Sequence, residues 1–179
     1  WTGRHEPHNQ GTTDLELTGE RNNWNTYRTG VRRSIAHMIS GRGLGGGRAY
    51  SSGVCNGTGG YGLSAIDANY NDPTNTTTWD IEVITHELGH SFGSFHTHSC
   101  QWATLGLVPA KTTLDSCQAS EEGCANYALH VPLDQGPIIS YCPLASTFAA
   151  CLLPHFPPLV IPPPPPFPHP HRCPTAPPP

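Results

Sequence analysis

The segment THELGHSFGSFHTHSC, residues 85–100, holds four of the chain's eleven histidines. His86 and His90 are four residues apart, about one helical turn, so on a helix both imidazoles lie on one face and can share a cation. His96 is six residues further on, and a continued helix would turn it about 240° away from that face. The chain must therefore turn back, and Gly93 suits this turn because glycine adopts the left-handed conformation without a Cβ penalty.

Three imidazoles are the donor set of a catalytic zinc site, since they leave one coordination position open. Glu87 directly follows the first ligand and can reach a water on the metal. Zinc acidifies such a water, and Glu87 can take its proton and return it to a leaving amine. The sequence therefore predicts one catalytic Zn²⁺ at His86, His90 and His96, with Glu87 as the catalytic residue of amide hydrolysis.

The alternative is a histidine-rich surface helix with no metal. Five spaced positions match the pattern H-E-x-x-H-x-x-G-x-x-H, and their joint occurrence by chance is rare, so the metal site is favoured. His98 and Cys100, just beyond the pattern, are expected to support the site or the fold without binding the metal.

Helices and strands must position these residues. Residues 80–92 are predicted to form the helix that carries the first two histidines, with two acidic residues in its first turn favouring the helix dipole. Apolar residues recur at three- and four-residue spacing from Trp24 to Met38, which predicts a second helix. Residues 48–54 and 61–66 are predicted strands. The irregular order of helices and strands favours an α+β fold of two or three layers.

The spaced motif from His86 to His96 resembles the elongated zinc motif of the metzincin zinc peptidases. Similarity to the reprolysin-like (adamalysin-related) branch extends over residues 23–144. It is carried, in chain order, by SGRGLGGGRAYSSGVCNGTGGYGLSAI, WDIEVITHELGHSFGSFHTHSC and GPIISYC. The resemblance implies a zincin-like, twisted mixed sheet with the active-site helix behind it, in a catalytic domain placed at residues 1–150.

The resemblance also implies where a substrate binds. The strand at residues 61–66 would lie at the edge of the cleft, where a protein or peptide substrate adds as an extended strand through main-chain hydrogen bonds. The residues expected to form this substrate edge are Gly62, Leu63, Ser64 and Ala65.

Residues 137–142 resemble the Met-turn of this branch, with Ile139 in the place of the methionine beneath the metal. Isoleucine can fill an apolar floor of similar volume at under about 1.5 kcal/mol. The alternative for this segment is the end of a buried strand. Tyr141 is a candidate for contact with the oxyanion, although a structural role is the favoured interpretation. The terminal elements of the family's domain are not evident, so a truncated catalytic domain is expected.

Seven cysteines and two glycosylation acceptor sites, Asn56 and Asn75, favour a secreted, disulfide-bonded glycoprotein. The cysteine pairing does not follow from the sequence, although Cys117 and Cys124 are close enough to close a short loop. Residues 151–179 are proline-rich, without helical or strand periodicity, and are expected to be a disordered tail.

A net charge of −4, with no cluster of Lys or Arg, argues against a nucleic-acid partner. No apolar stretch is long enough to predict a membrane span. Neither calcium binding nor the oligomeric state follows from the sequence.

The leading hypothesis is a secreted zinc endopeptidase. Two alternatives stay open. Because of Ile139 and the absent terminal elements, the chain could be a catalytically impaired, metzincin-like fragment that binds zinc or peptide without turnover. Because of residues 151–179, it could instead be a proline-rich interaction protein. The complete set of ligands and Glu87 favour the peptidase.

Overall fold

The computed structural model describes residues 11–68, 79–124, 128–130 and 137–142 of the chain. The elements of this part are α1 (Thr13–Tyr27), β1 (Ala36–Ser40), β2 (Gly47–Ala49), β3 (Tyr61–Ala65), α2 (Trp79–Ser91) and α3 (Gln101–Thr104). They form an α+β fold, as predicted. The proline-rich segment 151–179 and the acceptor Asn75 lie outside the described residues. No helix among the described residues has the length and apolar character needed to cross a membrane.

The three described strands form a mixed sheet in the order β1-β3-β2. β1 runs parallel to β3, and β2 runs antiparallel to it. The predicted substrate edge of Gly62, Leu63, Ser64 and Ala65 is therefore wrong, because β3 has a hydrogen-bonded strand on each side. The position of a strand in a sheet depends on its partners, and local composition does not reveal them.

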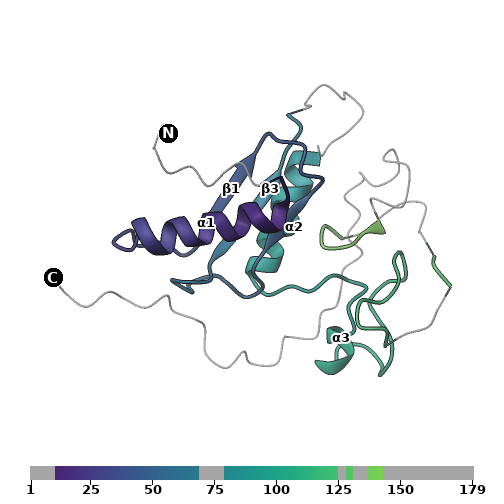
Figure 1. The fold of residues 1–179 in the computed structure, drawn as a ribbon. Helices are drawn as coiled ribbons and strands as arrows, with labels where there is room; N and C mark the ends of the chain where they lie inside the picture. Colours follow the sequence, from purple (N-terminus) through teal and green to yellow (C-terminus); the bar gives the residue numbers. More distant parts are fainter. Residues whose placement is uncertain (1–10, 69–78, 125–127, 131–136, 143–179) are drawn as a thin grey trace.

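The two long helices cover opposite faces of this sheet, with α1 in front of it and α2 behind it in Figure 1. Alternate residues of β3 face opposite layers. Tyr61 and Leu63 are fully buried in the core that includes Leu17 of α1. Ser64 points the other way, and its hydroxyl donates to the carbonyl of Val83 in α2 at 3.3 Å. Because helices cover both faces, all five residues of β3 are buried.

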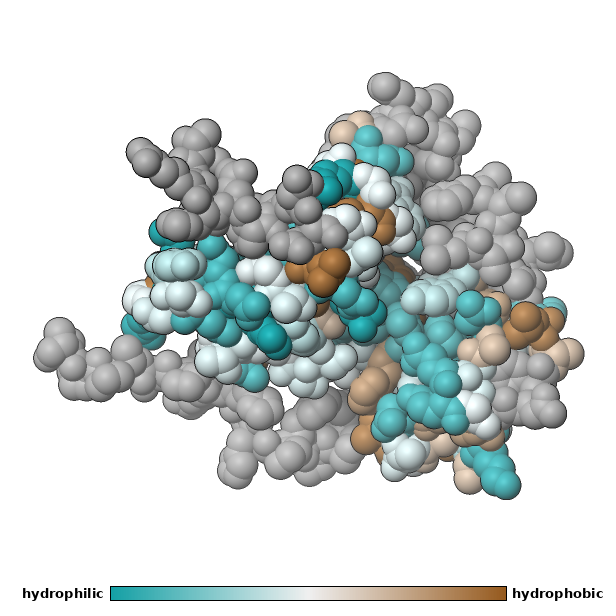
Figure 2. Space-filling view, in the orientation of Figure 1, coloured by the Kyte–Doolittle hydropathy of each residue, from teal (hydrophilic) through white to brown (hydrophobic). Residues whose placement is uncertain are grey.

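Helix α1 begins at a polar cap and lies earlier than predicted. Thr12 is its N-cap, and the Thr12 hydroxyl accepts a hydrogen bond from the backbone N–H of Leu15 at 3.3 Å. Figure 2 shows mainly hydrophilic side chains on the outer surface of α1. The helix predicted over residues 24–38 is wrong beyond Tyr27. The apolar spacing there joins the end of one helix to a strand, and Val31 between them is 48 % exposed.

Helix α2 confirms the helix predicted over residues 80–92. Its first turn is tied to the end of β3, because the indole of Trp79 donates to the carbonyl of Ala65 at 3.0 Å. The buried carboxylate of Asp80 accepts from the backbone N–H groups of Asp67 and Ala68, at 2.9 and 3.1 Å. These contacts fix the start of the helix relative to the sheet.

The last turn of α2 is held by the loop between β2 and β3. The N–H of Ser52 donates to the carbonyl of His90 at 3.0 Å, and the N–H of Val54 donates to that of Ser91 at 3.1 Å. Two carbonyls that the helix leaves without intrahelical partners are thereby satisfied. The histidine-bearing helix is therefore fixed at both ends by the sheet and its connections.

Candidate metal centre

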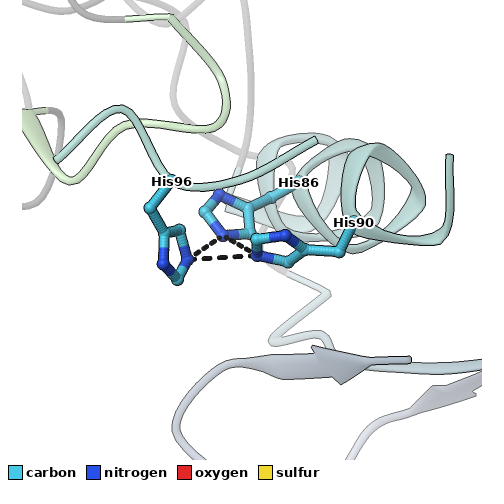
Figure 3. Close-up of side chains that lie close together, drawn as sticks. All are labelled: His86, His90 and His96. Atoms are coloured by element: carbon cyan, nitrogen blue, oxygen red, sulfur yellow. Dashed lines mark hydrogen bonds between the residues drawn. The ribbon is translucent and has the colours of Figure 1, made fainter. Parts of the chain in front are cut away.

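The imidazoles of His86, His90 and His96 converge at one point. Figure 3 shows the first two projecting from α2 and the third from the segment that follows it. Their Nε2 atoms are separated by 3.2 Å between His86 and His90, and by 3.1 Å from each of these to His96. Gly93 makes the return possible, with φ +97 in the left-handed region. The predicted turn and the approach of the third imidazole are both present.

The other ring nitrogen of each imidazole has an oxygen partner. Nδ1 of His86 contacts the carbonyl of Ile138 at 2.8 Å, and Nδ1 of His90 contacts that of Ser94 at 2.8 Å. Nδ1 of His96 contacts a carboxylate oxygen of Glu121 at 2.5 Å. Carbonyl and carboxylate oxygens only accept, so each Nδ1 is the donor. In the neutral rings each Nε2 is therefore without a proton.

Three lone pairs that face one another at this distance repel unless a cation lies between them. Burial favours the neutral form of two of these rings, those of His86 and His90. Burial, the largest cause, lowers the pKa of His86 to about 4, and burial also lowers the pKa of His90. Zinc at about 2.0–2.1 Å from tetrahedral nitrogen ligands would place them about 3.3 Å apart, close to the observed separations. The three imidazoles therefore fit a zinc ion in both chemistry and spacing.

The side chain of Glu87 points from α2 towards β2, which is at the edge of the described sheet. This side chain is 4 % exposed, and its Oε2 has no hydrogen-bond partner among the described residues. Burial raises the pKa of Glu87 to about 7, and the positive charge of Arg48 opposes this shift. A Cβ on Gly47 would lie 2.4 Å from Cγ of Glu87, so β2 approaches the carboxylate as closely as only glycine permits. A buried carboxylate with a free oxygen is suited to exchange a proton with a water molecule.

The segment predicted as a Met-turn lies against α2. The N–H of Ser140 donates to the carbonyl of Pro137 at 2.8 Å, so the segment is a turn and the alternative of a buried strand end is wrong. A Cβ on Gly89 of α2 would lie 3.1 Å from Cδ1 of Ile139, which places this apolar side chain against the histidine-bearing helix. Ile138 supplies the carbonyl that holds His86.

Tyr141 packs its ring among the imidazoles. The centroid of its ring is 4.6 Å from that of His96, 4.8 Å from that of His98 and 5.9 Å from that of His86. These contacts support the structural role that the sequence favours. A role at the oxyanion stays a prediction.

Two disulfides tie the residues beyond α2 together, and they differ from the pairing suggested by sequence distance. Cys100 is bonded to Cys124, and Cys117 is bonded to Cys142. The suggested disulfide between Cys117 and Cys124 is therefore wrong, because each of these cysteines is bonded to a partner that is more distant along the chain. The two bridges interleave, so together they cross-link one continuous loop region.

Sequence reasoning missed Glu121 and Glu122. Glu121 contacts His96, as described above. Glu122 accepts hydrogen bonds from the hydroxyl of Ser99 at 3.0 Å and from the N–H of Cys100 at 2.7 Å. Burial would raise the pKa of this carboxyl, but these hydrogen bonds lower it overall. The only signal in the sequence is an acidic pair beside a cysteine, which does not indicate what the pair contacts.

His98 supports the third imidazole, as expected. Its ring is 2 % exposed and stacks on that of His96, with 5.0 Å between ring centroids and an interplanar angle of 7°. Burial lowers the pKa of His98, so the ring is kept neutral beside the cluster.

Comparison with known families adds one match. The sequence model of a family described as "Metallo-peptidase family M12B Reprolysin-like" matches residues 1–97 of the 179-residue chain. The matched range ends directly after His96, so it includes all three imidazoles and Glu87. A search of curated proteins finds no match.

Proposed function

The chain belongs to the reprolysin-like metallopeptidases of family M12B, and from this we propose that it is a zinc-dependent endopeptidase. The observation that carries the proposal is the convergence of the three Nε2 atoms, 3.1–3.2 Å from one another, with the glutamate of the motif buried beside them. A zinc ion bound there supplies a Lewis acid that acidifies water towards neutrality.

The residues of the chain have separate tasks in this proposal. His86, His90 and His96 hold the ion, each with its Nδ1 proton fixed by an oxygen acceptor. Glu87 accepts a proton from the attacking water at its free Oε2 and returns it to the leaving amine. Ile139 forms part of the apolar surface against α2.

We place the substrate at β2. Among the described strands β2 pairs only with β3, and it passes directly beside Glu87. An extended peptide can add to such an edge through main-chain hydrogen bonds, as β-strand addition requires. Protein substrates agree with membership of a peptidase family.

We also propose that the protein is secreted and glycosylated. Two disulfides join described residues, which fits an oxidising compartment. Asn56 and Thr58 of the first acceptor site are exposed, and the Thr58 hydroxyl donates to the Asn56 side chain at 3.2 Å. Removal of N-linked glycans by an endoglycosidase should lower the mass of the secreted protein, and Asn56→Gln should abolish the part of this change that arises at Asn56.

The test of the peptidase is a comparison of wild type with Glu87→Ala. Wild type should cleave a denatured protein substrate, and the variant should not, while both bind one zinc per chain. Equal inertness of both proteins with zinc bound would reject the peptidase and favour a domain that binds zinc or peptide without turnover. Glu87→Ala with full activity would remove Glu87 from the mechanism.

A further inference from the structure

The three imidazoles differ in what holds their Nδ1 atoms. His86 and His90 donate to neutral backbone carbonyls, those of Ile138 and Ser94. His96 donates to the carboxylate of Glu121 at 2.5 Å. Hydrogen bonds to an ionised acceptor are shorter and roughly twice as strong as those to a neutral one. His96 is also the one imidazole of the three that α2 does not carry, so its orientation depends on contacts outside the helix.

Glu121 is itself held in place from several directions. Its N–H donates to the carbonyl of His98 at 3.2 Å, so its backbone is bonded to the segment that carries His96. The next residue, Glu122, accepts from Ser99 and Cys100. The disulfide between Cys100 and Cys124 closes the same small region. The side chain of Glu121 is 40 % exposed, but its own N–H and the residues that follow it are held by these contacts.

We propose that Glu121 is the positioning residue for the third metal ligand: its carboxylate holds the Nδ1 proton of His96, so that the proton-free Nε2 faces the other two imidazoles. This inference rests on the proposed zinc site. It places part of the site in a segment beyond residue 97, where the match to the family ends. His98 stacks on the ring of His96, and its Nε2 lies 3.7 Å from the same carboxylate oxygen of Glu121.

The physical reason is the choice between two tautomers. A neutral imidazole without a partner can carry its proton on either nitrogen, and only the Nδ1–H form presents Nε2 to a metal. A carboxylate at Nδ1 selects that form, fixes the ring and raises the basicity of the ligand. Loss of such an outer partner typically reduces metal affinity or activity by about 10–100-fold.

The variants that test this are Glu121→Ala, Glu121→Gln and the matched control Glu122→Gln. Zinc affinity is measured by competition with a chelator, and the unfolding midpoint of each metal-free protein is measured in parallel. We expect Glu121→Ala to bind zinc about 10–100-fold more weakly than wild type. Glu121→Gln should be affected less, because its amide oxygen still accepts from Nδ1. Glu122→Gln should lower the unfolding midpoint while zinc affinity stays close to that of wild type.

A second measurement reports on the ring directly. Long-range ¹⁵N–¹H spectra of the metal-free proteins should show His96 with its proton on Nδ1 in wild type and a mixture of tautomers in Glu121→Ala. Unchanged zinc affinity in Glu121→Ala would overturn the proposal, as would an equal loss in Glu121→Ala and Glu122→Gln. A wild-type His96 with its proton on Nε2 would also overturn it.

These outcomes are separate from the fate of the proposed peptidase. A wild-type protein that binds zinc and cleaves nothing would reject the peptidase, and the affinities of the Glu121 variants would still decide the role of Glu121. A wild-type protein that binds no zinc would reject the metal site, and the tautomer of His96 in the metal-free proteins would still test the contact.

Discussion

Two parts of the molecule meet at the three imidazoles. The packed part, the described residues between 13 and 93, consists of α1, the three-stranded sheet and α2, and it contains His86, Glu87 and His90. The looped part, the described residues between 94 and 142, contains His96, Glu121 and Tyr141, and its one helix is the four-residue α3.

The interiors of the two parts differ in kind. The packed part buries apolar side chains, Leu17, Tyr61 and Leu63 among them. In the looped part, every buried apolar residue that the structure describes is a cysteine, and its other buried residues are polar. Two disulfides and the carboxylates of Glu121 and Glu122 therefore replace an apolar core there. The comparison teaches that one ligand of the site comes from a cross-linked region, while the other two come from a helix that packs on the sheet.

The largest effect should follow from removal of a cross-link in the looped part. The double variant Cys117→Ser, Cys142→Ser opens a loop of 25 residues, which should lower the free energy of unfolding by about 2–4 kcal/mol. Chemical denaturation measures this loss. Hydrogen exchange should accelerate in residues 94–124 and stay slow in β3. Equal acceleration in β3 would show that the two parts unfold as one, against the comparison.

A smaller effect should follow from adding a methyl group where β2 passes close to Glu87 in the packed part. In Gly47→Ala the new Cβ would meet Cγ of Glu87, so overpacking should destabilise the protein by about 1–3 kcal/mol and displace the carboxylate. Cleavage should fall while zinc stays bound. The control is Gly43→Ala, where a Cβ meets nothing within 4 Å and which should behave like wild type. Similar losses in both variants would count against the role given to this contact.

The two parts also differ in how far the sequence predicts them. The motif from His86 to His96 predicts its own geometry, because helical periodicity and the freedom of Gly93 are local properties. The contact of Glu121 with His96 joins residues that are 25 apart along the chain, in a region that two interleaved disulfides cross-link. Nothing local in the sequence specifies that contact.

The packed part limits prediction in another way. Residues 61–66 are predicted as a strand, and β3 is found there, but its place between β1 and β2 depends on the other strands. The apolar spacing from Trp24 to Met38 fits a helix, although its two ends belong to α1 and β1. Short apolar repeats do not distinguish one helix from a helix followed by a strand.

Removal of the cap of α1 should have a smaller effect, confined to the packed part. Thr12→Ala takes away the hydroxyl that accepts from the N–H of Leu15, which typically lowers stability by about 1 kcal/mol. Because α1 lies on the sheet face opposite α2, zinc affinity and cleavage should be unchanged. Thermal unfolding and a chelator competition measure the two quantities. A parallel loss of zinc affinity would show that α1 is coupled to the site.

The smallest effect on activity is expected at Tyr141. If its ring only packs among the imidazoles, Tyr141→Phe keeps those contacts, and the rate of cleavage should change by less than about threefold. Loss of an oxyanion donor would instead lower kcat by about 10²–10³. Steady-state kinetics on a peptide substrate distinguish the two roles. A loss of kcat of the larger size would show that Tyr141 contacts the oxyanion and is a catalytic residue.

The most direct test of the central claim is calorimetric titration of the metal-free protein with zinc, for wild type and for His96→Ala. The claim is that the looped part completes a site begun by the packed part, so wild type should bind one zinc per chain and the variant should bind far more weakly. Equal affinity in the two proteins would contradict it, since two imidazoles on α2 would then suffice without the third.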